Sequence, residues 1–315
     1  MDKRKFKSYC GNEEDYSEYV EYLNTAKECF KEGAQYWKNL VDKRRKPYTD
    51  PDGTYRRKSH PFYTNIISFL NIQKKEKIFN FTKYGIKVKI NNKILTIRSD
   101  QLGFGAPKHI YRRKTKKYIH NSWDTRYPYA YYILKGGETK KVADYIWDSR
   151  TLGGSFLWPT IPYRGSVYNT NRGVGGYIYD RADLTLLEIK KFYKFYKNNK
   201  DPKIIQNLMI SSNCILMKDD DYIEIYNWLS YFESFKKYVD FFCFREKDGK
   251  ENFVNSNYEV LSLVTNEPIK DGHSEKGIDE MDLKEIEAIL KNTHNHIINR
   301  TEIIEGIIYG ETNKK

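Results

Sequence analysis

The pattern of apolar and polar positions changes from period two to helical spacing near Asp183. Residues 86–90 alternate apolar and basic side chains, Asn91-Asn92 can form a turn, and residues 94–97 resume a β-branched run. This order predicts a hairpin with one solvent-facing basic face. Further short strands are predicted over residues 129–134, 142–147 and 155–158.

Aspartates mark the helix starts that are predicted in the second half of the chain. Asp183 can cap a helix whose Leu184, Leu187, Phe192 and Phe195 are helically spaced. Asp201-Pro202 places a capping residue before a proline at the first helical position, which predicts a helix through about residue 217. Two more helices are predicted, one after residues 219–221 and one over about 279–298.

The start of the chain predicts one more helix, over residues 13–40, followed by a turn-rich basic loop over 43–60. Together these elements predict an α+β protein with an N-terminal helix, a central, mostly antiparallel β region and a helical C-terminal half. We expect residues 1–60 to form the N-terminal helix and loop, and residues 61–310 to form the main α+β domain.

Positive charge is concentrated in one segment of the 315-residue chain, whose formal net charge is +13. Residues 61–120 contain 14 Lys and Arg against 2 Asp and Glu, whereas residues 1–60 contain 14 against 11. A localised basic region favours nucleic acid or an acidic protein surface as a partner. The chain also contains 28 Tyr, whose half-apolar side chain suits interfaces, so the sequence also allows a homo-oligomer.

No segment is long and apolar enough to predict a membrane span, and no apolar signal core follows the N-terminus. We therefore expect a cytoplasmic protein that does not contact a membrane. Cys10, Cys29, Cys214 and Cys243 are scattered and form no Cys-x-x-Cys pair, so we expect reduced thiols and no metal cluster. The glycine clusters match neither a Walker loop nor a dinucleotide fingerprint, and we expect no cofactor.

A basic, aromatic-flanked stretch is the candidate binding segment. Cations interleaved with rings are what a nucleic-acid groove uses, since charge pairs with phosphate and rings stack on bases. A solvated loop is the alternative. The candidate residues are Tyr111, Arg112, Arg113, Lys114, Lys116, Lys117 and Tyr118.

A metal-dependent nuclease is the catalytic alternative, with some arrangement of Asp180, Asp183, Glu188 and Lys190. Such a site needs its paired acid and lysine on one strand, but Glu188 and Lys190 fall in a predicted helix, where positions two apart diverge. His294 and His296 diverge for the same reason, and we expect them to be exposed. No catalytic triad stands out.

Three segments, in this order along the chain, resemble an uncharacterised family of bacterial proteins of unknown function. They are residues 150–159, residues 171–193 with Asp-Arg-Ala-Asp-Leu-Thr-Leu, and residues 235–242 with Tyr-Val-Asp-Phe-Phe. The resemblance extends over about residues 99–244 and implies no activity, cofactor or catalytic residue. It singles out Arg172, Asp180, Arg181 and Asp183 as one charged network, for which we expect a structural role, with a binding site as the alternative.

Two main functions are therefore open, beside a third, a sequence-nonspecific nucleic-acid binder without chemistry. The first is a non-enzymatic binding protein whose basic, Tyr-rich surface engages a protein or a protein–nucleic-acid assembly, with weak nonspecific nucleic-acid binding at most. The excess of Tyr, Lys, Asn and Ile is typical of an AT-rich genome and would suit a phage or mobile-element inhibitor of a host defence complex. The second is the metal-dependent nuclease or toxin.

Overall fold

The computed structural model describes residues 61–82, 84–90, 92–102, 111–112, 117–118, 137–138, 141, 151–163, 166–169, 181–218, 220–270 and 281–312. Several predicted features lie outside these residues and stay predictions. They are the helix over residues 13–40, the loop over 43–60, and the strands over 129–134 and 142–147.

A five-stranded sheet in the order β1-β2-β3-β6-β7 forms the centre of the described structure, and each strand pairs antiparallel with its neighbours. The strands are β1 (Asn80–Thr82), β2 (Gly85–Ile90), β3 (Lys93–Gln101), β6 (Ser155–Tyr163) and β7 (Ser166–Asn169). The predicted antiparallel β region is thereby confirmed.

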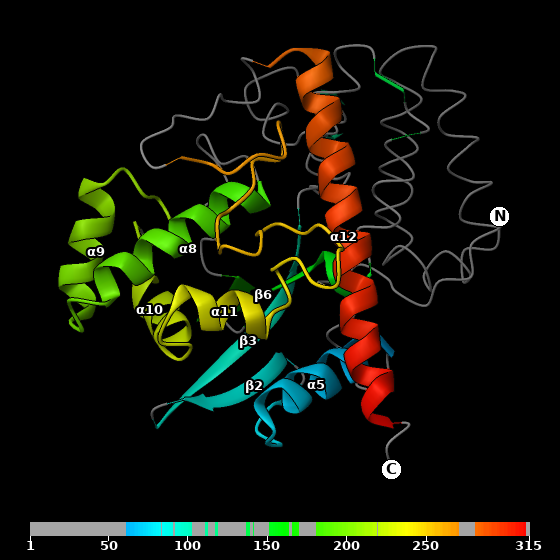
Figure 1. Cartoon of the computed structure of the whole chain (residues 1–315). Coiled ribbons are helices and arrows are strands. Elements are labelled where there is room, and N and C mark those ends of the chain that lie inside the picture. The colour runs from blue at the N-terminus through cyan, green and yellow to red at the C-terminus, as the bar shows by residue number, and fades with distance from the viewer. Residues whose placement is uncertain are drawn as a thin grey trace.

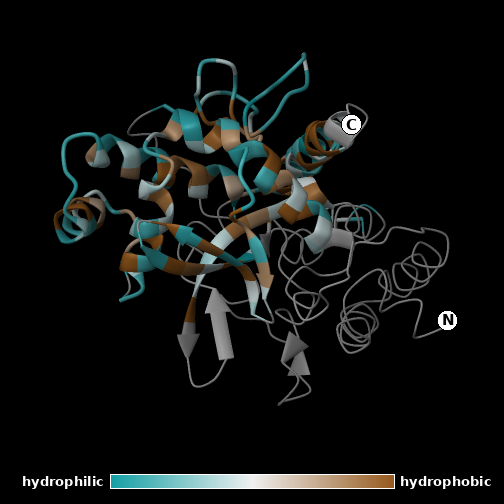
Figure 2. Cartoon of the chain, turned by 90° about the horizontal axis from the view of Figure 1, so that it is seen from below, coloured by the Kyte–Doolittle hydropathy of each residue, from teal (hydrophilic) through white to brown (hydrophobic). Residues whose placement is uncertain are grey.

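The hairpin predicted over residues 86–97 is confirmed, together with its basic face. Ile86 of β2 lies opposite Ile97 of β3, and the turn uses Asn92 with a positive φ of 63°. In β2 the apolar residues are buried and Lys87 and Lys89 are exposed, as strand alternation requires. Figure 2 shows this alternation of hydrophilic and hydrophobic residues along the strands.

One described helix precedes the sheet in the chain and the others follow it, which confirms the α+β class and the helical C-terminal half. Figure 1 shows α8 to α11 grouped on one side of the molecule, while the long α12 runs past β6 and α5. The helices are α5 (Pro61–Lys74), α8 (Ala182–Tyr196), α9 (Pro202–Ser211), α10 (Tyr222–Ser230), α11 (Phe235–Phe241) and α12 (Leu283–Thr312).

Aromatic side chains join the sheet to these helices. Phe156 of β6 lies 5.6 Å from Trp158 and 5.3 Å from Phe244, between ring centroids. Trp228 of α10 packs on Phe232 and Phe242 at 5.1 and 5.8 Å. All six side chains are buried, so one apolar core connects β6 with the residues around α10 and α11.

Helix boundaries differ from the prediction at several points. Asp201 caps α9 as predicted, and its Oδ1 accepts the N–H groups of Lys203 and Ile204. That helix ends at Ser211, before Asn213, whose φ of 58° breaks the helix. Asp183 is not the N-cap of α8; Arg181 occupies that position and Asp183 lies in the first turn.

Arg300 of α12 forms hydrogen bonds with backbone carbonyl groups of two other parts of the chain. Its side chain is buried; Nε donates to the carbonyl oxygen of Phe242 at 2.8 Å, and Nη1 donates to those of Gly153 and Ser155 at 2.5 and 2.8 Å. The guanidinium also lies 4.1 Å from the centroid of the Phe244 ring. Burial lowers the pKa of Arg300 to about 10.

The prediction that both α12 histidines are exposed is wrong for His296, which is 1% exposed. It faces the core, where its ring packs on Phe253 at 5.0 Å, because α12 is covered by residues 251–263 on that side. His294, two residues earlier, is half-buried.

Candidate functional site: a lysine-lined groove

A hollow of about 820 Å³ lies between the second half of α8, the start of α11 and the loop that contains Tyr258. We call it the lysine groove, because six lysines line it and one carboxylate, that of Glu233, lies among them. The six are Lys190, Lys191, Lys194, Lys197, Lys200 and Lys236.

The amphipathic pattern of α8 explains why the lysines share one side. Leu186, Ile189 and Phe192 are buried in the core, which fixes the rotation of the helix. Lys190, Lys194 and Lys197 then recur at intervals of four and three residues, the spacing that places side chains in one row. The core thus holds a row of cations along the groove.

Two of these lysines have no partner in the part of the chain that the structure describes. Lys194 and Lys197 are exposed, and neither forms an ion pair or a hydrogen bond with a described residue. Lys200 instead lies 3.3 Å from the centroid of the Tyr196 ring and donates to the Tyr196 carbonyl oxygen. Lys194 and Lys197 are therefore available to an external anion.

The carboxylate of Glu233 is already paired. Lys237 Nζ lies 2.5 Å from its Oε2, and this hydrogen bond, with the charges of Lys237, Lys74 and Lys200, lowers the pKa of Glu233. Glu233 therefore stays ionised, and its negative charge is offset first by Lys237, which is not one of the groove lysines. The side chains that line the groove therefore have a net positive charge.

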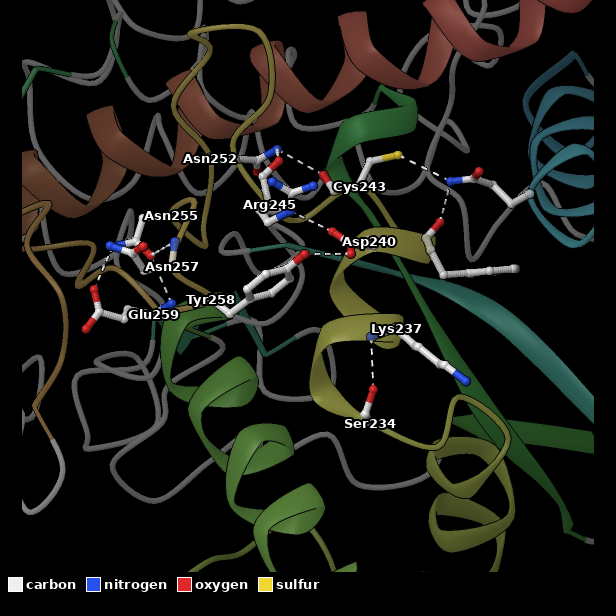
Figure 3. A network of polar contacts seen from close by, with 12 residues as sticks. Ser234, Lys237, Asp240, Cys243, Arg245, Asn252, Asn255, Asn257, Tyr258 and Glu259 are labelled. Carbon is white, nitrogen blue, oxygen red and sulfur yellow. Dashed lines mark hydrogen bonds and ion pairs between the residues drawn. The ribbon is translucent and has the colours of Figure 1, made fainter. Parts of the chain in front are cut away.

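Tyr258 forms one wall of the groove and is held by a polar network (Figure 3). Its hydroxyl donates to Asp240 Oδ2 at 2.8 Å, while Asp240 Oδ1 accepts from Arg245 Nε at 2.6 Å. Burial, followed by the hydrogen bond to Asp240, raises the pKa of Tyr258, so its hydroxyl remains a donor.

The backbone at Tyr258 is in the left-handed region, with a φ of 62°. Asn255 supports this turn, since its Oδ1 accepts the N–H groups of Asn257 and Glu259 (Figure 3). A bulky residue at positive φ persists only where the surroundings fix it, and such positions cluster at functional sites. The ring of Tyr258 is thus placed at the groove by several independent contacts.

Of the charged network that the resemblance singled out, the structure brings Arg181 and Asp183 together. Arg181 donates through Nε and Nη2 to the two oxygens of Asp183, at 3.1 and 2.5 Å, and both side chains are fully buried. Asp183 also accepts the N–H groups of Leu184 and Leu263, at 2.9 and 2.8 Å. Arg172 and Asp180 lie outside the described residues.

The basic stretch around Arg112 is described only in its backbone. Strands β4 (Tyr111–Arg112) and β5 (Lys117–Tyr118) pair antiparallel, with Tyr111 opposite Tyr118 and Arg112 opposite Lys117. The sequence analysis did not predict this pairing. Arg113, Lys114 and Lys116 lie outside the described residues, and a role of the stretch in binding stays a prediction.

Glu188 and Lys190 lie on α8, as the helical pattern predicted. Glu188 is buried and accepts the N–H groups of Ile215 and Leu216 at 3.0 and 2.8 Å, which ties α8 to the loop after α9. Lys190 lines the groove. Within the described ranges, no group of His, Cys, Asp and Glu side chains is arranged to hold a metal ion.

The described cysteines are free and buried. Burial raises the pKa of the Cys214 thiol to about 11, although Lys191 beside it opposes the change. Burial likewise raises the pKa of Cys243 to about 11. Cys10 and Cys29 lie outside the described residues.

Among the described helices, none has the length and apolar character that a membrane span requires.

Comparisons with known proteins identify the family of the chain. No curated protein and no solved structure matches it. A family model described as "Family of unknown function (DUF6994)" matches residues 111–304, which include all six groove lysines. This match confirms the resemblance to an uncharacterised family, although it begins later than residue 99 and continues beyond residue 244. The chain therefore belongs to the family of unknown function DUF6994.

Proposed function

We propose that this chain is a non-enzymatic binding protein that engages an acidic partner, a protein or a protein–nucleic-acid assembly, through the lysine groove. The observation that supports the proposal is the row of lysines on one rigid helix face beside a hollow. Lys194 and Lys197 in this row are exposed and have no carboxylate partner within the described residues.

The row is unfavourable without a ligand. Lys190 and Lys194 are four residues apart, and Lys194 and Lys197 are three apart, and each like-charge pair destabilises a helix by about 0.2 to 0.5 kcal/mol. A bound anion removes this repulsion and gains charge-assisted hydrogen bonds. Because the core fixes α8, the partner has to order only the lysine side chains and not the helix that presents them.

Capture from cells in which the protein is native tests the proposal. The tagged chain is compared with the double variant Lys194→Gln, Lys197→Gln, and with a control that removes two charges from α12, Lys284→Gln, Lys291→Gln. Lys284 and Lys291 are also exposed helical lysines. We expect the wild type and the control to retain the same acidic partner, and the groove variant to lose it.

Equal capture by all three proteins would contradict the proposal. The metal-dependent nuclease remains the alternative, and the same preparations test it. Strand cleavage that requires Mg²⁺ would move the protein to the enzyme class.

A further inference from the structure

A second hollow, of about 460 Å³, adjoins the lysine groove at Glu233, which lines both. It lies beside the end of α5 and the connection between α10 and α11. Lys74, Tyr231 and Lys237 are among its lining residues. The two hollows therefore adjoin at one side chain, and a ligand that occupies both is larger than a single small anion.

The carboxylates that line the two hollows already form ion pairs or hydrogen bonds with other residues of the protein. Glu233 pairs with Lys237, at 2.5 Å. Asp240 accepts from Arg245 at 2.6 Å and from the Tyr258 hydroxyl at 2.8 Å. An anion that lies along both hollows therefore meets lysines without meeting an unpaired carboxylate of the described chain.

Each hollow also places an aromatic ring beneath a lysine. Lys236 Nζ lies 4.9 Å from the ring centroid of Tyr258 in the groove, and Lys74 Nζ lies 4.6 Å from that of Tyr231 in the second hollow. A phosphate that draws the lysine aside would uncover the ring face. A base could then stack on the ring while the lysine contacts the phosphate.

A single-stranded nucleic acid fits this pairing of charge and ring. Its bases are exposed and stack on aromatic side chains irrespective of sequence. A duplex keeps its bases stacked inside and offers phosphates and base edges but no free base face. An acidic peptide offers charge without flat faces. Lys197 is the C-cap of α8, its backbone is still helical, and it follows Lys190 by seven residues. Their row is therefore about 10 Å long, about three nucleotides at the stacked spacing.

We infer that the ligand of the lysine groove is a single-stranded nucleic acid whose strand continues into the second hollow. This inference rests on the proposed function and names the chemistry of the partner. Lys194 and Lys197 contact phosphates in the groove, and Tyr258 and Tyr231 stack bases, one in each hollow. The binding is indifferent to sequence.

Fluorescence anisotropy with three labelled probes tests the inference. The probes are a 12-nucleotide thymidine strand, the same strand paired with its complement, and a polyglutamate peptide. We expect the full-length protein to bind the single strand at least tenfold more tightly than the other two probes. Lys194→Gln, Lys197→Gln should weaken this binding at least tenfold, and Lys284→Gln, Lys291→Gln should leave it unchanged.

The ring is tested by Tyr231→Leu, which should weaken binding of the single strand about fivefold or more and leave peptide binding unchanged, because only a base stacks. Lys74→Gln provides a second variant of the same hollow in case Tyr231→Leu fails to fold, and it should also weaken single-strand binding.

The remaining outcomes separate the inference from the proposed function. A preference for polyglutamate or duplex that is lost in the double groove variant would overturn the inference and leave the proposed function standing. Failure to bind any probe would also overturn the inference. Binding that is indifferent to Lys194 and Lys197 would overturn both.

Discussion

Asp183 is the residue on which the contacts at the start of α8 converge. It accepts two hydrogen bonds from Arg181 and two from backbone N–H groups, and it is fully buried. Asp183→Ala leaves the buried guanidinium without this carboxylate, a change that commonly costs about 3 to 5 kcal/mol. We expect a correspondingly lower free energy of unfolding in urea denaturation.

The matched control replaces both charges. Arg181→Leu, Asp183→Leu should lose less stability than Asp183→Ala, because no unpaired buried charge remains. If Asp183→Ala is as stable as the wild type, the pair of Arg181 and Asp183 does not stabilise the fold.

His296 gives stability a pH dependence of known sign. Burial lowers its pKa from 6.5 to about 4, against the opposing charges of Glu251 and Asp183. The unfolded chain therefore binds a proton that the folded protein does not bind between these values. The free energy of unfolding therefore has its full value above pH 6.5 and decreases as the pH falls toward 4. The decrease that is due to His296 amounts to about 3 kcal/mol.

Urea denaturation at pH 7.5 and at pH 5 measures this dependence. His296→Met should reduce the loss of stability between the two pH values, whereas His294→Gln, in the half-buried neighbour on α12, should retain it. Identical pH profiles of the wild type and His296→Met would contradict the assignment.

At the scale of elements, the contact between α12 and the short 3-10 helix η3 (Leu152–Gly154) requires a glycine. A Cβ at Gly153 would lie 2.1 Å from the carbonyl oxygen of Ile297 and 2.5 Å from the N atom of Thr301, and both are backbone atoms. Gly153→Ala must separate the two elements, and we expect it to lower the melting temperature, with a cost of about 1 to 3 kcal/mol.

Gly306, also on α12, provides the matched comparison. A Cβ there meets nothing within 4 Å of the described structure. Because alanine favours a helix interior over glycine by about 1 kcal/mol, Gly306→Ala should raise the melting temperature. Equal effects of the two substitutions would show that α12 does not pack closely on η3.

Elements with local signals could be predicted from the sequence, and those fixed by tertiary contacts could not. The hairpin follows from its alternation, and α9 from Asp201-Pro202. The sequence analysis missed α5, although Tyr63, Ile66, Phe69 and Leu70 are helically spaced, because the turn-rich segment before it hid the pattern. The burial of His296 depends on residues 251–263, which no local pattern places against α12.

At the scale of the whole molecule, net charge over long segments of the sequence does not reveal the lysine groove. Residues 121–315 contain 27 Lys and Arg against 29 Asp and Glu, which conceals five lysines between positions 190 and 200. Counting charge along the predicted face of α8 would have found the row. Folding adds Tyr258 and Glu233, which lie far from α8 in the sequence.

The salt dependence of binding to the 12-nucleotide strand tests the central claim most directly. Each phosphate contact on a single strand contributes about 0.7 to the slope of log affinity against log salt concentration. Lys194→Gln, Lys197→Gln should therefore reduce the magnitude of the slope by about 1.4, twice that value. Lys284→Gln, Lys291→Gln should keep the wild-type slope. Equal slopes for the two double variants would contradict the assignment of the groove as the binding surface.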